Sequence, residues 1–178
     1  MTQKKIEAGS RFPSFPAKNL QGEVVDLSKP ANGTDWKMIV IYRGRHCPLC
    51  TKYLNELEGH IKALKKLGID TVAVSADSQD QLQDHLSQLN VSFPLYYGLS
   101  LEQMKQLGLY ISIPRSEKET DHLFPEPGLF VINAEGNVQV VDLSNNPFVR
   151  PTLTNLVNGL GWIRDPENNY PIRGTYGS

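Results

Sequence analysis

The sequence predicts an α/β domain of three layers, in which helices cover both faces of a mixed central sheet. The unbroken apolar run at residues 38–42 is typical of a strand covered on both faces, as in a parallel sheet. Strands then alternate with leucine-striped helices, which is the order of parallel strands joined by helices. A strand, a turn signal and a second strand at residues 129–141 predict an antiparallel edge.

The elements follow one another clearly along the chain. Residues 22–27 predict a short hairpin arm, and Pro48 suits the first turn of a helix that ends near Gly68. One apolar stripe marks that helix, formed by Leu54, Leu57, Ile61, Leu64 and Leu67. The β-branched run at residues 71–75 predicts the next strand.

Two capping boxes and a final helix complete the pattern. Ser78 with Gln81 and Ser100 with Gln103 each predict the start of a helix. Residues 110–124 have the polar, charged character of a solvated loop. A last helix carries Leu153, Leu156, Val157 and Leu160 and is expected to end at Gly161.

Size and charge bound the function. The 178 residues predict a single domain, 1–178, with an N-terminal arm at 1–35 and an irregular C-terminal tail at 162–178. A formal net charge of -1 gives no reason to expect binding to nucleic acid or to a membrane surface. No apolar run is long enough to span a bilayer, and the first residues lack a secretory pattern, so a cytoplasmic location is expected.

The two cysteines, Cys47 and Cys50, lie between the apolar strand and the striped helix. A thiolate at a helix N-terminus is stabilised by free backbone N–H groups, and its pKa falls below about 8.5. Arg43, Arg45 and His46 place positive charge nearby in the sequence. We expect Cys47 to be the more exposed and more acidic thiol, which attacks a partner, and Cys50 to be the buried thiol that resolves the intermediate.

Two simpler explanations of the pair stay open. Free cysteines are often packed in a core without any chemistry. A structural zinc site needs four ligands, and the pair supplies two, with His46 adjacent and other histidines scattered. The strand, the Cys-x-x-Cys spacing and the helix together favour redox chemistry, so neither a metal nor another cofactor is expected.

Three segments, residues 15–27, 40–50 and 127–136, carry a resemblance to a known family. They resemble the alkyl hydroperoxide reductase/thiol-specific antioxidant family, which includes peroxiredoxin-like proteins. The resemblance implies a thioredoxin-like α/β/α sandwich with an N-terminal β extension. It also implies antioxidant or disulfide chemistry at the cysteine pair.

The sequence departs from the family's pattern around the reactive thiol. Cys50 aligns with the peroxide-reactive cysteine, but Cys47 stands at a threonine position, Arg43 at a proline position and Pro127 at an arginine position. Arg43, Arg45 or Arg150 could replace the missing hydrogen-bond donors. Pro127 matches the cis-proline of thioredoxins by position, so a cis peptide beside the cysteines is expected.

Three functions are consistent with the sequence. The first is a thiol–disulfide oxidoreductase acting on protein or small-molecule disulfides and thiols. The second is a peroxiredoxin-like thiol peroxidase that reduces hydroperoxides. The third is a redox-sensing module whose disulfide state alters its contacts. The sequence leaves open the physiological substrate, the recycling reductant, the reduction potential and whether the chain forms a homodimer.

Overall fold

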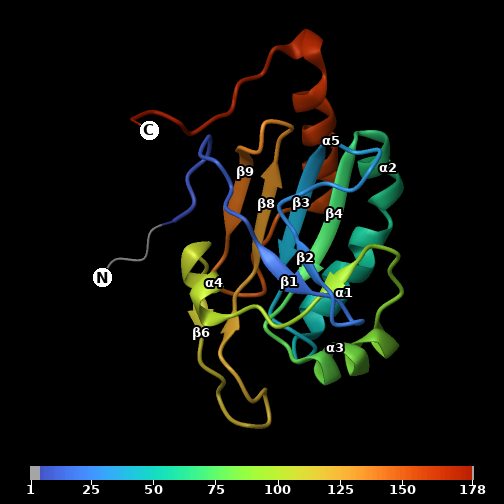
Figure 1. The fold of residues 1–178 in the computed structure, drawn as a ribbon, viewed down its shortest axis with the longest axis vertical. Helices are drawn as coiled ribbons and strands as arrows, with labels where there is room; N and C mark the ends of the chain where they lie inside the picture. The colour runs from blue at the N-terminus through green and yellow to red at the C-terminus, as the bar shows by residue number, and fades with distance from the viewer. Residues whose placement is uncertain (1–4, 178) are drawn as a thin grey trace.

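A computed structural model describes residues 5–177, and its centre is a mixed sheet with strand order β5-β4-β3-β8-β9 (Figure 1). Within the described residues, β3 is parallel to β4 and β4 to β5, whereas β8 is antiparallel to β3 and β9 to β8. The predicted mixed sheet is confirmed. The strands are β3 (Trp36–Ile41), β4 (Ile69–Val74), β5 (Leu95–Tyr96), β8 (Gly128–Ile132) and β9 (Val138–Leu143).

The two faces of the sheet bury separate cores because side chains alternate along each strand. From β3, Met38 and Val40 join a core with α1 (Pro48–Glu58), α2 (Ile61–Lys66) and α5 (Leu153–Arg164). Ile39 and Ile41 join the opposite core with α4 (Leu101–Gln106) and the N-terminal segment. All six residues of β3 are buried, as the unbroken apolar run predicts.

The predicted N-terminal β extension is present as a hairpin of β1 (Pro16–Lys18) and β2 (Val24–Asp26). Figure 1 shows this hairpin crossing the sheet. Phe12, Phe15 and Leu27 flank it and are buried against the sheet. The arm is therefore part of the core.

The helix predicted from residue 48 to residue 67 is interrupted. Its chain turns at Gly59 and His60, which separate α1 from α2. The apolar stripe continues because both helices pack on the same face of the sheet. Periodicity alone did not show the interruption, since glycine disfavours a continuous helix only weakly.

Both capping boxes are confirmed. Ser78 caps α3 (Gln79–His85) and Ser100 caps α4, and in each box the serine backbone N–H donates the reciprocal bond to the side chain of the glutamine three residues on. A short 3₁₀ turn, η1 (Leu86–Gln88), follows α3.

The segment expected to be a solvated loop, residues 110–124, contains structure. β6 (Ile111–Ser112) pairs antiparallel with β7 (Phe124–Pro125), and Thr120 and Phe124 are buried. The pairing was not predicted because the residues between the two strands are mostly charged and polar, which is typical of a loop. Because β7 leads directly into β8, this pairing positions Glu126 and Pro127 between the two strands.

The C-terminal boundary also differs from the prediction. Helix α5 continues through Gly161 to Arg164, so Trp162 to Arg164 are helical and not part of an irregular tail. The stop comes at Asp165, because the residue before Pro166 is driven to an extended conformation. The 3₁₀ turn η2 (Pro166–Asn168) follows. Among residues 5–177, no helix is long and apolar enough to cross a membrane.

Candidate functional site

The loop between β3 and α1 is fixed by the carboxylate of Asp77, whose side chain is fully buried. Asp77 Oδ2 accepts a hydrogen bond of 2.8 Å from the backbone N–H of Arg45. Gly44 has a φ of 136°, and a Cβ there would lie 2.5 Å from Asp77 Oδ1. Glycine is therefore required for the backbone to pass this close to the carboxylate. The loop then delivers Cys47 to the start of α1.

Cys47 is the N-cap residue of α1. Its Sγ accepts a hydrogen bond of 3.3 Å from the backbone N–H of Cys50, and Pro48 occupies the first helical turn. The pKa of Cys47 is lowered to about 6, first by the hydrogen bond from the Cys50 thiol, then by this N–H and by Arg43, against the effect of burial. The lowered pKa agrees with the sequence-based expectation. Cys47 is 1% exposed and Cys50 0%, so Cys47 is the more exposed thiol by a negligible margin and both thiols are buried.

Cys50 lies on the same helix and is completely buried. Its pKa is raised, first by the hydrogen bond that its thiol donates to Cys47, then by burial and by the negative charge on Cys47. Both residues are free thiols in this structure. These opposite shifts favour a thiolate on Cys47 and a proton on Cys50 near neutral pH.

Arg150, which precedes α5, reaches the second sulfur. Its Nη2 lies 3.2 Å from Cys50 Sγ and 3.0 Å from the carbonyl oxygen of Pro147. The guanidinium also lies over the ring of Tyr53, 4.8 Å from the ring centroid. Arg150 opposes the raised pKa of Cys50, because a positive charge favours a thiolate. Of the three arginines considered as replacement donors, Arg150 is the one that contacts Cys50, whereas Arg43 acts on Cys47.

Arg43 serves Cys47 from the other side. It is one of the causes of the lowered Cys47 pKa, and it stacks over the ring of Phe124 at 4.7 Å. Its Nε lies 3.0 Å from Oε1 of the buried Glu126, which is an ion-pair distance although the two atoms are not aligned as a hydrogen bond. Glu126 is held in turn by the hydroxyl of Ser112. The positive charge beside Cys47 is thus partly balanced by a carboxylate.

The other two predicted supporting residues do less than expected. Arg45 turns outward, where its Nη1 pairs with Asp84 Oδ2 at 2.9 Å, and it contributes to the site through its backbone N–H. His46 packs edge-on against Phe124, and neither ring nitrogen has a hydrogen-bond partner in the described chain. Burial, aided by Arg43, lowers the pKa of His46. Its ring is therefore neutral at pH 7 and supplies no positive charge to the thiolate.

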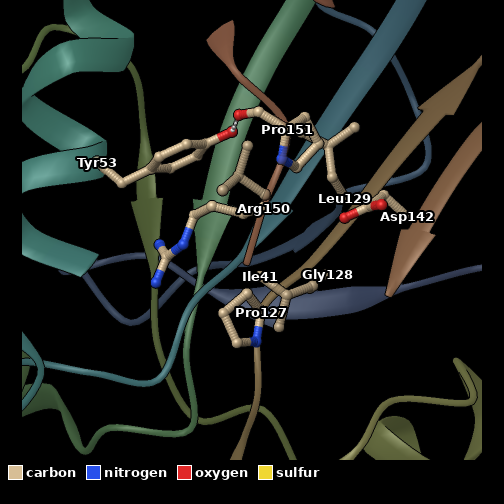
Figure 2. A pocket seen from close by; sticks show the side chains of 9 residues that line it. Ile41, Tyr53, Pro127, Gly128, Leu129, Asp142, Arg150 and Pro151 are labelled. Atoms are coloured by element: carbon tan, nitrogen blue, oxygen red, sulfur yellow. Dashed lines mark hydrogen bonds between the residues drawn. The ribbon is translucent and has the colours of Figure 1, made fainter. Parts of the chain in front are cut away.

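The prediction of a cis peptide before Pro127 is wrong, because no peptide bond in residues 5–177 is cis. The extended chain is anchored on both sides of this bond. The N–H of Glu126 donates to the carbonyl of Tyr110, and the N–H of Ser144 donates to the carbonyl of Pro127. Pro127 still belongs to the site, because it lines a small cavity together with Tyr53 and Arg150 (Figure 2).

Three residues that shape the site were not predicted to have a role in its chemistry. Asp77, Glu126 and Tyr53 fix the loop, balance Arg43 and contact Arg150, respectively. Tyr53 had one signal, since its spacing from Cys50 places the two side chains on the same face of the helix. Asp77 and Glu126 had none, because both act across long sequence separations. No cluster of three or more metal-ligating side chains lies within residues 5–177.

The fold and the paired thiols at the N-terminus of α1 define a thiol-dependent oxidoreductase with a thioredoxin-like architecture. The family model described as the AhpC/TSA family matches residues 8–141. The chain therefore belongs to the AhpC/TSA family. No curated protein sequence matches it.

Solved peroxiredoxin structures share its fold at low sequence identity. Peroxiredoxin 6 of Arenicola marina superposes with a TM-score of 0.74 at 16% identity, covering 91% of this chain and 75% of that one. The peroxiredoxin-like protein of Aquifex aeolicus gives 0.68 at 19% identity, covering 88% and 87%. AhpC of Mycobacterium tuberculosis gives 0.71 at 13% identity, covering 92% and 96%. These likenesses establish the thioredoxin-like fold.

Proposed function

We propose that the chain is a thiol–disulfide oxidoreductase in which Cys47 and Cys50 alternate between a dithiol and a disulfide. The observation that carries this proposal is the pair of thiols at the start of α1, where Cys47 Sγ accepts a hydrogen bond from the backbone N–H of Cys50. One of them is held as a thiolate near pH 7, and the other is held within reach as its proton donor. A nucleophilic thiolate beside a second thiol is what disulfide exchange requires.

The first step forms a mixed disulfide. The Cys47 thiolate attacks one sulfur of a protein or small-molecule disulfide, forms a new S–S bond to it and releases the other sulfur as a thiolate. The released thiolate takes up a proton from solvent. Because the negative charge on Cys47 is consumed, its effect of raising the Cys50 pKa disappears at this point.

The second step resolves the intermediate. Cys50 loses its proton and attacks Cys47 Sγ, which closes the intramolecular disulfide and releases the second substrate sulfur as a thiolate. The substrate has then gained two electrons, and the enzyme has lost them. A dithiol reductant would return the pair to the starting state by the reverse exchange.

A second function, reduction of hydroperoxides at Cys50, is favoured by one specific contact. Arg150 places a positively charged donor 3.2 Å from Cys50 Sγ, where it could stabilise both the thiolate and a departing oxygen. A Cys50 thiolate would attack the peroxide, forming a sulfenic acid and releasing an alkoxide that is protonated to an alcohol. The Cys47 thiolate would then attack Cys50 Sγ and expel hydroxide.

Burial of the cysteine pair presents different steric barriers to a disulfide and to a peroxide. Neither cysteine is more than 1% exposed, so a bulky disulfide must displace neighbouring atoms before it reaches Cys47. A peroxide is small and meets a lower steric barrier. If a disulfide nevertheless reacts faster than peroxide, the difference in rate reflects the reactivity of Cys47 and not the steric accessibility of the site.

The test is a stopped-flow comparison on the fully reduced protein. Tryptophan fluorescence or rapid alkylation followed by mass spectrometry reports the loss of thiols after mixing with hydrogen peroxide or with a small aromatic disulfide. The proposal expects fast reaction with the disulfide, and peroxide oxidation near the rate of an ordinary thiol. Rapid formation of a sulfenic acid at Cys50, lost in Cys50→Ser and kept in Cys47→Ser, would overturn it in favour of the peroxidase.

A further inference from the structure

Tyr53 connects helix α1 to the segment that carries Arg150. Its hydroxyl donates a hydrogen bond of 2.8 Å to the carbonyl oxygen of Pro151, and the face of its ring lies 4.8 Å from the Arg150 guanidinium carbon. Figure 2 shows the tyrosine reaching from α1 to Pro151, with the Arg150 side chain beside its ring. One side chain thus contacts two successive residues of the segment before α5. Cation–π contacts of this kind favour a fixed position for the guanidinium.

The orientation of the guanidinium follows from these contacts. Nη2 carries two N–H groups, and its two acceptors are the carbonyl oxygen of Pro147 and the sulfur of Cys50. Tyr53 follows Cys50 on the same face of α1 because residues three apart on a helix are neighbours. The helix therefore presents the sulfur and the ring to the same guanidinium.

Close packing does not by itself hold Arg150 in place. Beside it lies a cavity of about 10 Å³ for the centre of a water-sized sphere, roughly the room for one water molecule. Tyr53, Pro127 and Asp142 line this cavity together with Arg150 (Figure 2). With open space on one side, the ring of Tyr53 and the carbonyl of Pro147 become the contacts that direct the guanidinium to the sulfur.

The groups that act on Cys50 come from several elements. Cys47 acts from α1, Tyr42 follows β3, and Arg150 precedes α5. Asp142 of β9 lines the cavity beside Arg150, and burial raises the pKa of its carboxyl. Burial also raises the pKa of Tyr53 to about 12, so its hydroxyl keeps the donated proton throughout the neutral range.

We propose that Tyr53 is a positioning residue that holds Arg150 against Cys50 Sγ, so that Cys50 ionises once Cys47 has entered a mixed disulfide. The inference rests on the proposed dithiol function for its meaning, since the ionised Cys50 is the group that closes the disulfide. In the resting dithiol, the Cys47 thiolate opposes ionisation of Cys50. In the mixed disulfide that charge is gone, and Arg150 is left as the charged neighbour in contact with the sulfur.

The experiment uses the Cys47→Ser protein, in which Cys50 is the single thiol and no thiolate opposes it. The pKa of Cys50 is measured from the pH dependence of iodoacetamide alkylation, without any substrate. Tyr53→Leu and Arg150→Met are introduced separately and together, and Tyr53→Phe keeps the ring while removing the bond to Pro151. Tyr96→Leu is the matched control, because Tyr96 is a buried tyrosine in the opposite core.

We expect Arg150→Met to reduce the thiolate fraction at pH 7 about tenfold, and Tyr53→Leu to reduce it by nearly as much. In the double variant, Tyr53→Leu should add nothing to Arg150→Met, and Tyr53→Phe should have the smaller effect. Equal effects of Tyr53→Leu with and without Arg150 would overturn the proposal, as would a Cys50 pKa that Tyr53→Leu or Arg150→Met leaves unchanged. If Tyr53→Leu does not fold, Tyr53→Phe is compared with and without Arg150→Met. Its effect on the thiolate fraction should again disappear when Arg150 is absent. The alkylation measurement uses no disulfide substrate, so its result does not depend on whether the proposed disulfide exchange takes place. Failure of this inference is therefore distinguishable from failure of the proposed function.

Discussion

The two sulfurs of the pair lie one helical turn apart, yet different parts of the chain serve them. Cys47 is surrounded by residues close to it in sequence, namely Arg43, the loop at Gly44 and the N-terminus of its own helix. Cys50 receives its arginine from Arg150, 100 residues further along the chain. The first thiol therefore depends mainly on nearby residues, together with the Asp77 carboxylate that fixes its loop, whereas the second takes its arginine from a distant segment.

The balance of charge also differs between the two sites. Arg43 has the buried carboxylate of Glu126 as an ion-pair partner. Arg150 has an aromatic ring and a backbone carbonyl as partners, and no carboxylate pairs with it in the part of the chain that the structure describes. The charge beside Cys47 is thus moderated, whereas the charge beside Cys50 is directed at the sulfur.

The largest effect should come from exchanging each cysteine for serine. We expect Cys47→Ser to lower turnover of a disulfide substrate by roughly 10³-fold or more, because the nucleophile is lost. Cys50→Ser should instead form a mixed disulfide that persists, which intact-protein mass spectrometry detects as added substrate mass. The roles of the two thiols would be reversed if Cys47→Ser accumulated the adduct.

The second effect is a dependence of stability on pH. The pKa of Cys47 is about 6 in the folded state and near 8.5 to 9 in the unfolded chain, so the folded state binds fewer protons between these values. Stability should rise with pH from about 6 to about 8.5, by up to about 1.4 kcal/mol for each pKa unit, and this contribution is lost as pH falls through 6. Above about 8.5 the raised pKa of Cys50 acts in the opposite direction.

Urea unfolding of the reduced protein at a series of pH values, compared with Cys47→Ser, provides the measurement. The difference in free energy of unfolding between the two proteins should widen from pH 6 to pH 8.5. A constant difference across this range would show that the Cys47 thiolate is not favoured by folding.

The third effect separates the two arginines. Arg43→Met should raise the pKa of Cys47 and slow its alkylation at pH 6 by roughly three- to tenfold, because one of its stabilising charges is removed. Arg150→Met should change Cys47 much less, since Arg150 contacts the other sulfur. Arg45→Met is the matched control, because that side chain pairs with Asp84 at the surface. Equal slowing by all three variants would indicate a general loss of positive charge.

The smallest effect, and one of opposite sign, should come from Glu126→Gln. Removing the carboxylate beside Arg43 leaves its positive charge less balanced, so the pKa of Cys47 should fall and alkylation at pH 6 should quicken about twofold. Ser112→Ala removes the hydrogen bond to Glu126 without changing the charge and is the control. Slower alkylation in Glu126→Gln would mean that Glu126 acts mainly by holding Arg43 in place.

Patterns formed by neighbouring residues predicted much of the fold and the surroundings of Cys47, but not those of Cys50. The buried strand, both capping boxes and the thiol at a helix start each depend on neighbouring residues, and each is present. Arg150 was one of three arginines considered as a hydrogen-bond donor to the reactive thiol. The sequence does not specify which arginine lies next to Cys50, because this depends on how distant segments pack. The tertiary fold decided between them.

The errors have the same origin. Cys47 was expected to be the more exposed thiol, but its exposure exceeds that of Cys50 by only 1% because both cysteines join the core cluster that α1 and α5 form with the sheet. Pro127 was expected in the cis form, but the pairing of β7 with β6 brings an extended chain into β8, and a trans bond satisfies its backbone partners. In both cases the deciding contacts come from segments distant in sequence, which local patterns do not report.

The sulfur of Cys47 caps the N-terminus of α1, so the atom proposed to react also stabilises the start of the helix. A thiolate is a strong acceptor for the N–H of Cys50, whereas a sulfur in a disulfide carries no charge and accepts weakly. Oxidation therefore removes a cap from the first turn of α1. Amide hydrogen exchange at Cys50 and Thr51 should speed up when the pair is oxidised, so the fraying of one helical turn records the redox state of the protein.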